Sequence, residues 1–186
     1  MREMMIDIET LDVTRTAVVP QVGYCVFQGE TVITSRQMNL RVQEQLPDYM
    51  GPAAGGRTVR WATIQFWMRQ PDEARLSIID DTETYSADHV LKALWADASE
   101  LNVERFWAKG SFDFDILEDL FAQHSNEKLP WNFRTKRDLR TELDHLPKHL
   151  HPERTGVAHT GLGDALYQHQ QLVALRRQFA AGNITR

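Results

Sequence analysis

Cysteine is almost absent from this chain of 186 residues, which has a single one, Cys25. One cysteine excludes an intramolecular disulfide and a zinc site built from several thiolates. Cys25 lies in an apolar run from Val22 to Phe27. We therefore expect it to be a small buried hydrophobic residue rather than a reactive thiol.

Long hydrophobic runs are absent as well. No apolar stretch approaches the ~18 residues that a transmembrane helix needs. Residues 1–9 carry acids where a signal peptide needs an uninterrupted apolar segment. These absences lead us to expect a cytoplasmic protein with no membrane partner.

An excess of positive charge is also missing, because 21 Lys and Arg face 26 Asp and Glu, for a net charge of −5. A protein that binds nucleic acid through its overall positive charge would be basic. If this chain binds a polyanion, a local basic patch or bound cations must offset the repulsion. Its length and its 42% hydrophobic content are typical of a globular chain with its own core. We expect residues 1–186 to form one domain.

The expected order of elements is three β-rich segments followed by alternating helices and strands. Met4–Ile8, Gln21–Phe27 and Thr31–Leu40 indicate an antiparallel meander. The remaining pattern predicts helices over Arg57–Arg69, from Ser86, from Ser111 and over Gly163–Ala181, a strand over Val103–Trp107, an extended piece over Leu129–Phe133, and a loop over Leu46–Gly56. This order favours a three-layer α/β or α+β domain with a mixed sheet.

Asp7 and Glu9 lie two residues apart in the first predicted strand. The two-residue period of a strand puts both carboxylates on one face. Adjacent carboxylates in an apolar segment are costly unless cations lie between them. A merely solvent-exposed face would explain the pair equally well, so this pattern is weak by itself.

A second acidic feature follows the strand at Val103–Trp107. After Gly110, Asp113 and Asp115 fall in the first turn of the helix that starts at Ser111. A carboxylate there is stabilised by the helix dipole, so either acid could simply cap the helix. The two side chains point about 200° apart around a helix and cannot both face one site.

A third feature is the segment His159-Thr-Gly-Leu-Gly-Asp164 near the C-terminus. Its glycines give the loop conformational freedom. A titratable histidine beside a carboxylate is a suitable arrangement for a general base near a metal. A structural histidine and a capping aspartate are the alternatives.

Taken in order, Asp7-Ile-Glu9-Thr10, Phe112-Asp113 and His159-(four residues)-Asp164 resemble the motifs of the DEDDh superfamily of 3′–5′ exonucleases. The similarity is greatest to its bacterial and phage exoribonuclease-like subgroup, in which a Trp-rich helix follows the meander and Arg-Asp-Leu-Arg-Thr precedes the third motif. Here these are residues 61–69 and 137–141. The four residues between His159 and Asp164 are Thr-Gly-Leu-Gly, whereas a sequence of the Ala-Leu-Asp type is more usual in the subgroup.

The resemblance implies a ribonuclease-H-like α/β fold, with a mixed five-stranded sheet, an antiparallel three-strand meander and helices on both faces. It also implies two Mg²⁺ ions, for which Mn²⁺ can substitute, held by Asp7, Glu9, Asp113 and Asp164. Asp7 would bridge both ions, and Asp113 would act through water. His159 would deprotonate the attacking water, and the motif favours Asp113 over Asp115.

By the same resemblance, Thr10 and Leu11 line the terminal nucleotide. Candidates for stacking on bases are Phe112 and Trp61, and candidates for phosphate contacts are Arg137 and Arg140. Trp67 fits core packing better than stacking. Arg57 and Arg60 are further phosphate candidates, although a surface or salt-bridge role is the usual one for any single arginine.

The function that follows is a metal-dependent 3′–5′ exonuclease that releases nucleoside 5′-monophosphates from single-stranded DNA or RNA. The choice between DNA and RNA is open, and a homodimer is a further expectation from the relatives. The alternatives are an endonuclease of the same fold and an inert nucleic-acid-binding module. His145, His149 and His151 could form a second metal site, but the adjacent prolines and Lys148 indicate an exposed loop.

Overall fold

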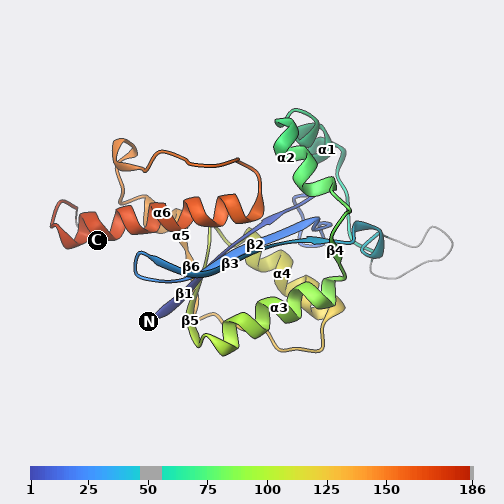
Figure 1. The fold of residues 1–186 in the computed structure, drawn as a ribbon, viewed down its shortest axis with the longest axis horizontal. Helices are drawn as coiled ribbons and strands as arrows, with labels where there is room; N and C mark the ends of the chain where they lie inside the picture. The colour runs from blue at the N-terminus through green and yellow to red at the C-terminus, as the bar shows by residue number, and fades with distance from the viewer. Residues whose placement is uncertain (47–55, 185–186) are drawn as a thin grey trace.

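A computed structural model describes residues 1–46 and 56–184 of the chain. Its centre is one six-stranded sheet of order β4-β3-β2-β1-β5-β6 (Figure 1). The strands are β1 (Arg2–Glu9), β2 (Gln21–Gln28), β3 (Thr31–Leu40), β4 (Thr84–Tyr85), β5 (Val103–Ala108) and β6 (Lys136–Asp138). The meander β1-β2-β3 is antiparallel, and the pairs β1-β5, β5-β6 and β3-β4 are parallel. The predicted α/β fold with a mixed sheet is confirmed.

The predicted number of five strands was wrong. The two-residue strand β4 pairs only with Asn39 and Leu40 and is too short to leave a periodic signal. The last strand is β6 rather than Leu129–Phe133, which is irregular. The predicted loop over Leu46–Gly56 lies almost wholly outside the described residues.

Helices cover both faces of the sheet, as expected. They are α1 (Trp61–Met68), α2 (Asp72–Ile79), α3 (Ala87–Glu100), α4 (Phe112–His124), α5 (Leu139–Leu143) and α6 (Gly161–Ala180), with short 3₁₀ turns at Val42–Glu44 and Lys148–Leu150. Helix α2 was not predicted. Helix α1 begins four residues later than expected, because Thr58 forms a bridge with Ala17 and Arg60 is still extended.

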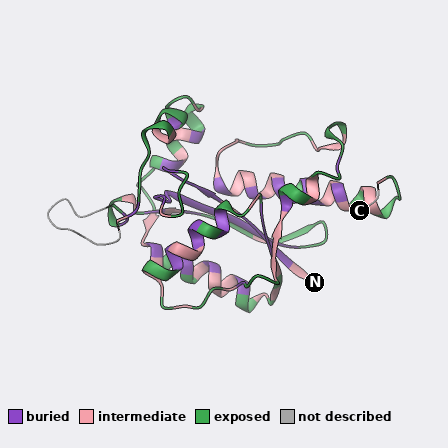
Figure 2. Cartoon of the chain, turned by 180° about the vertical axis from the view of Figure 1, so that it is seen from behind, coloured by how far each residue is buried: buried purple, intermediate pink, exposed green. Residues whose placement is uncertain are grey.

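Strand alternation divides the core into two layers. Met4, Ile6 and Ile8 of β1 pack with α3 and α4, whereas Met5 faces the opposite layer. In that second layer, Cys25 and Phe27 pack with α5 and α6. Figure 2 shows buried residues along the strands and on the helix sides that face them. Cys25 is fully buried, as predicted, and burial raises the pKa of its thiol to about 12.

Helix α6 approaches the sheet more closely than side chains would allow. A Cβ on Gly23 of β2 would lie 1.9 Å from the carbonyl carbon of Gly161, the first residue of α6. The Gly161 amide donates to Gln21 Oε1 at 2.7 Å. Since Gly23 is the register partner of Asp7, this contact brings the start of α6 next to Asp7.

Arg57 proves to be a buried structural residue rather than a phosphate contact. Its guanidinium pairs with Asp119 of α4 at 2.9 Å and donates to the carbonyls of Ala17 and Arg15. It therefore ties the segment before α1 to α4. No helix in the described part of the chain is long and apolar enough to cross a membrane.

Candidate active site

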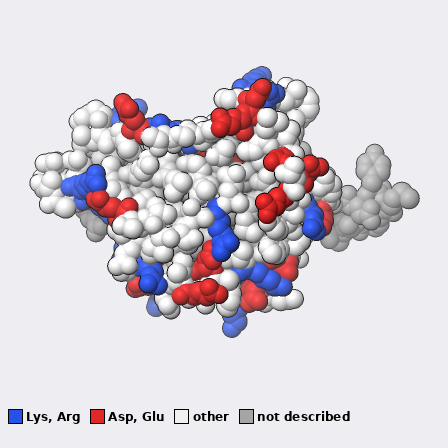
Figure 3. All heavy atoms as spheres, viewed as in Figure 1, with Lys and Arg blue, Asp and Glu red and all other residues white. Residues whose placement is uncertain are grey.

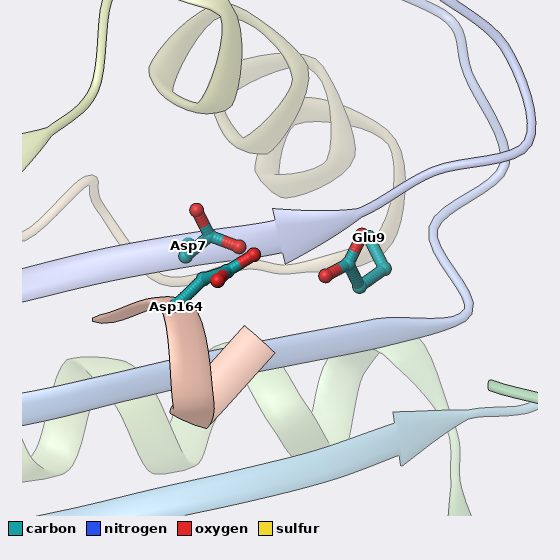
Figure 4. A group of neighbouring side chains, drawn as sticks. All are labelled: Asp7, Glu9 and Asp164. Carbon is teal, nitrogen blue, oxygen red and sulfur yellow. The ribbon is translucent and has the colours of Figure 1, made fainter. Parts of the chain in front are cut away.

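Three carboxylates meet where β1 ends and α6 begins. Asp7 and Glu9 come from one face of β1, and Asp164 comes from the first turn of α6. One oxygen of each lies within 4.8 Å of the others, and the three side chains point toward one another (Figure 4). The dipole at the start of α6 favours a carboxylate at position 164. Three oxygens at this spacing can ligate a divalent cation.

Asp113 joins the group from the other side of β1. Strand β5 pairs with β1 only as far as Met5 and Trp107, so Ile8 lies beyond the paired part of β1 on that side. The Ile8 amide instead donates to Asp113 Oδ1 at 3.1 Å. Asp113 is buried in the first turn of α4, whereas Asp115 is exposed. The geometry thus brings Asp113, and not Asp115, to the carboxylate pair.

The carboxylates are electrostatically costly as a group. Burial first, and then the charges of Asp113 and Glu9, raise the pKa of Asp7 well above its ordinary value. Burial and the charge of Asp113 raise the pKa of Glu9 to about 8. Burial also raises the pKa of Asp113 to about 7, against hydrogen bonds that lower it. Without a cation these groups therefore favour protonation near neutral pH.

The donor set fits a hard divalent cation. The oxygens that Asp7, Glu9 and Asp164 bring together are carboxylate oxygens, which such ions prefer. Glu9 Oε1 is buried and has no hydrogen-bond partner among the described residues, although a buried carboxylate oxygen normally has one. A cation bound between Glu9 and its neighbours would satisfy this atom.

His159 lies beside the carboxylates in a left-handed conformation with a φ of 61°. Its amide donates to Asp164 Oδ2 at 3.2 Å. Its ring packs edge-on against Phe66 of α1, with centroids 5.1 Å apart. Burial, and then the charge of Arg154, lower the pKa of the imidazole. The ring is therefore neutral at neutral pH and free to accept a proton.

A pocket of about 440 Å³ adjoins the carboxylates. Glu9 and His159 line it together with Ile8, Thr10, Val13, Arg60, Ala62, Thr63, Phe66, Trp67 and Phe112. Trp67 is buried and donates through Nε1 to the Thr10 carbonyl at 2.9 Å, which explains its core-like sequence pattern. The pocket thus combines aromatic walls with one acidic edge.

The predicted substrate contacts divide into two groups. Thr10 and Phe112 line the pocket, and Arg140 lies close enough to Asp113 to lower its pKa. Leu11 instead lines a separate hollow with Pro20 and Leu40, and Trp61 is 66% exposed outside the pocket. The Arg137 guanidinium donates to the carbonyls of Arg134 and Lys136.

The histidines at 145, 149 and 151 form no metal site in the described residues, where only the carboxylate group has ligand geometry. His151 Nε2 lies 3.2 Å from the Leu146 carbonyl, and its Nδ1 lies 3.2 Å from Gln171 Nε2. The ring of His145 packs near Phe179. These contacts give His145 and His151 structural roles.

The sequence interpretation missed two residues at the site. Gln168 is buried one helical turn after Asp164, and its Nε2 donates to Asp7 Oδ1 at 2.6 Å. The spacing of four residues could have placed it on the face of Asp164. Arg154 forms an ion pair with Asp164, and nothing in the local pattern around Arg154 predicts that contact.

Comparison with known families decides the classification. The sequence profile of the family described as the 3′-5′ exoribonuclease Rv2179c-like domain matches residues 2–175. The chain belongs to this family. It is thus a domain of a 3′–5′ exoribonuclease family, in agreement with the 3′–5′ exonuclease that the motifs predicted. A comparison with curated proteins found no match.

Solved structures support the same fold. E. coli exonuclease I in complex with a dT13 oligonucleotide is 15% identical, with a TM-score of 0.62, over 98% of this chain and 42% of that one. Its zinc-bound form with single-stranded DNA is 16% identical, with a TM-score of 0.59, over 98% of this chain and 42% of that one. A full-length 3′-exonuclease is 14% identical, with a TM-score of 0.60, over 97% and 82%. This chain therefore spans less than half of exonuclease I.

Proposed function

We propose that residues 1–186 act as one metal-dependent 3′–5′ exonuclease domain that removes nucleoside 5′-monophosphates from single-stranded RNA ends. The observation that carries this proposal is the juxtaposition of three carboxylates within 4.8 Å with an aromatic pocket that shares Glu9. We choose RNA over DNA as the proposed substrate because the matching family is described as an exoribonuclease. DNA remains an outcome of the test, since exonuclease I is complexed with single-stranded DNA.

In this proposal Asp7, Glu9 and Asp164, with Asp113 behind them, hold two Mg²⁺ ions, or Mn²⁺ in their place. When bound, such ions supply Lewis acidity, a reactive water and stabilisation of the leaving oxygen. Four carboxylates give the pair of ions a matching charge. Gln168 orients Asp7 by its hydrogen bond, as residues behind metal ligands commonly do.

His159 is the proposed general base. Its lowered pKa keeps a ring nitrogen available to accept a proton from the attacking water. The edge-on contact with Phe66 and the hydrogen bond from its amide to Asp164 hold it at the rim of the pocket. A phosphate held by cations at the carboxylates would therefore lie close to this base.

The pocket suits a single terminal nucleotide. Its volume of about 440 Å³ lies near the lower end of the range for small-ligand sites, ~300–1,000 Å³. Phe66, Trp67 and Phe112 offer aromatic surface for a base. Stacking is worth ~1–3 kcal/mol per base and reads little sequence, which suits a degradative enzyme. Arg140 is the proposed nearby phosphate contact.

Bound cations, rather than a basic surface, would attract the nucleic acid. On the face drawn in Figure 3, acidic and basic side chains are interspersed. The net charge of −5 agrees with this. Divalent ions at the carboxylates would reverse the local charge where the phosphate binds.

The test is digestion of matched RNA and DNA oligonucleotides, labelled at the 3′ or the 5′ end, with and without Mg²⁺. A 5′-labelled ladder that recedes from the 3′ end, with mononucleotide 5′-phosphates as products, supports the proposal. Internal cuts would indicate an endonuclease, and no cleavage with retained binding would indicate an inert module. Light scattering of the same sample tests the predicted homodimer.

A further inference from the structure

The Arg154 side chain forms an ion pair with Asp164, one of the proposed metal ligands. One guanidinium nitrogen, Nη2, contacts Asp164 Oδ1, and the two side chains are only 30% and 17% exposed. The other Asp164 oxygen accepts the His159 amide at 3.2 Å. Oδ2 thus accepts a hydrogen bond, whereas the buried Oδ1 accepts none from the described residues and has only the ion-pair contact with Arg154. A metal ion cannot take Oδ1 without displacing the guanidinium.

The guanidinium has a second anchor beside this contact. Its Cζ lies 4.8 Å from the centroid of the Tyr167 ring, and the Tyr167 hydroxyl donates to the Pro152 carbonyl at 3.3 Å. Tyr167 lies one turn after Asp164 on α6. A cation–π contact of this kind would keep Arg154 at the site after it leaves the carboxylate.

The charge of Arg154 also affects the pKa values of Glu9 and His159. It opposes the rise in the pKa of Glu9 that burial causes, and it helps to lower the pKa of His159. Arg154 therefore acts on the carboxylates as a bound cation would. It comes from the loop before α6, and Gly156 in that loop has a φ of 90°.

Charge balance suggests what the released arginine does. Four carboxylates and two divalent cations cancel, so the negative charge of an incoming phosphodiester is left without a partner. A guanidinium is a planar donor that suits phosphate oxygens. Arg154, retained on Tyr167, would be a positive charge next to Asp164, in addition to Arg140 near Asp113.

We propose, on the basis of the proposed function above, that Arg154 is a positioning residue that exchanges partners. It neutralises Asp164 while the metal ions are absent, gives way when they bind, and then contacts the phosphate of the chain end. The exchange predicts two opposite effects of removing the charge. Metal binding without nucleic acid becomes stronger, and substrate binding becomes weaker.

The first measurement is calorimetric titration of Mn²⁺ into the protein without nucleic acid. Arg154→Gln should bind Mn²⁺ about fivefold more tightly, as expected for losing a partly exposed competing ion pair. Arg154→Lys retains the charge and should stay within about twofold of wild type, on the same ion-pair scale. Arg177→Gln removes a surface arginine paired with Glu30 and should change nothing.

The second measurement is the KM for a single-stranded oligonucleotide at saturating Mn²⁺. Arg154→Gln should raise KM about tenfold, in line with a charge-assisted hydrogen bond, with a smaller change in kcat. Arg154→Lys should recover most of this loss. Thermal melting of each variant checks that the fold is kept.

The outcomes separate this inference from the proposed function. If the wild-type protein binds no Mn²⁺, the proposed function fails. If it binds Mn²⁺ but Arg154→Gln binds no more tightly, Arg154 only anchors the loop and the inference alone is overturned. Tighter Mn²⁺ binding with an unchanged KM would also overturn it, because the contact with phosphate would then be missing.

Discussion

Strand β1 carries buried carboxylates at both ends of one face, and the two ends differ in their partners. Near its start, both Glu3 oxygens accept hydrogen bonds from Arg176 of α6 at 2.8 Å, and one also accepts from Trp107 Nε1. Near its end, Glu9 Oε1 accepts no hydrogen bond from any residue that the structure describes. Asp7 accepts a hydrogen bond from the uncharged amide of Gln168.

The pKa values record the same difference. Burial acts to raise the pKa of Glu3, but the hydrogen bonds from Arg176 and Trp107 hold it below the ordinary value. Burial raises the pKa of Asp7 and Glu9 instead, with nearby negative charges adding to it. A buried acid that the protein satisfies itself stabilises the fold, whereas one that it leaves unsatisfied needs a ligand. The following expectations test this comparison.

The largest expected effect is on catalysis at the unsatisfied end. Asp7→Asn should reduce turnover by ~10³-fold or more, since it removes a proposed central metal ligand, while the protein still folds. Asp113→Asn should also lose activity. Asp115→Asn is the matched control, because Asp115 is exposed in the same helical turn. Initial rates on a 5′-labelled oligonucleotide measure all three, and full activity of Asp7→Asn would contradict the assigned site.

A smaller loss of rate is expected for the proposed base. His159→Ala should lower kcat ~10²–10⁴-fold, the usual contribution of general acid–base catalysis. Its Mn²⁺ affinity, measured by calorimetry, should remain near that of wild type because the carboxylates are untouched. Loss of metal binding in this variant would show that His159 is a ligand and not a base.

At the satisfied end, we expect a loss of stability without a loss of activity per folded molecule. Arg176→Met leaves Glu3 buried without its ion pair and should cost about 2–3 kcal/mol, less than the ~3–5 kcal/mol of a fully buried pair, because Arg176 is 34% exposed. Arg177→Met is the neighbouring control, whose partner Glu30 is exposed. Urea unfolding measures both, and equal effects would remove the distinction between the two arginines.

The smallest expected effect is a pH-dependent shift in thermal stability. In the folded state the pKa of Glu9 is about 8 against an ordinary value of 4.5, and that of Asp113 is about 7 against 3.8. Folding thus retains protons that the unfolded chain loses. The stability that these groups contribute is full below pH ~4 and is lost as the pH rises through about 8.

Melting of the metal-free protein should therefore occur at a lower temperature at pH 8.5 than at pH 5.5, by ~5 °C or more for a chain of this size. The pKa of Glu3 lies below this pH range. Glu3 is therefore ionised throughout and does not make the melting temperature depend on pH. Added Mg²⁺ should reduce the difference, because metal binding competes with protons. Glu9→Gln should flatten the profile in the absence of metal. A flat wild-type profile would mean that the carboxylates are solvated and need no cation.

Several features of the site could be read from residue order. The two-residue period of β1 puts Asp7 and Glu9 on one face, and helical geometry separates Asp113 from Asp115. The same reasoning could have found Gln168, four residues after Asp164. Each of these relations is local, because the backbone repeat alone sets the direction of the side chains.

Other features depend on which elements pack together. Residue order says nothing of the Gly23–Gly161 contact, which brings Asp164 to Asp7 across more than a hundred residues of chain. Leu11 was predicted from the motifs to contact substrate but lines a different hollow, and Trp61 was predicted to stack on bases but is exposed outside the pocket lining. Arg57 and Arg140 were both candidate phosphate contacts in the sequence, yet Arg57 is buried in an ion pair with Asp119.

Periodicity was thus enough to predict the α/β class, since it depends on repeats within single elements, and the resemblance of the motifs to known exonucleases predicted the family. The acids that we propose as metal ligands were named from the same motifs. Long-range packing settled the rest: the sixth strand, the pocket walls from α1, and the ion pair between Arg154 and Asp164. Those contacts join segments whose separation along the chain says nothing about their distance in space, so only the folded arrangement of the sheet and α6 could set them.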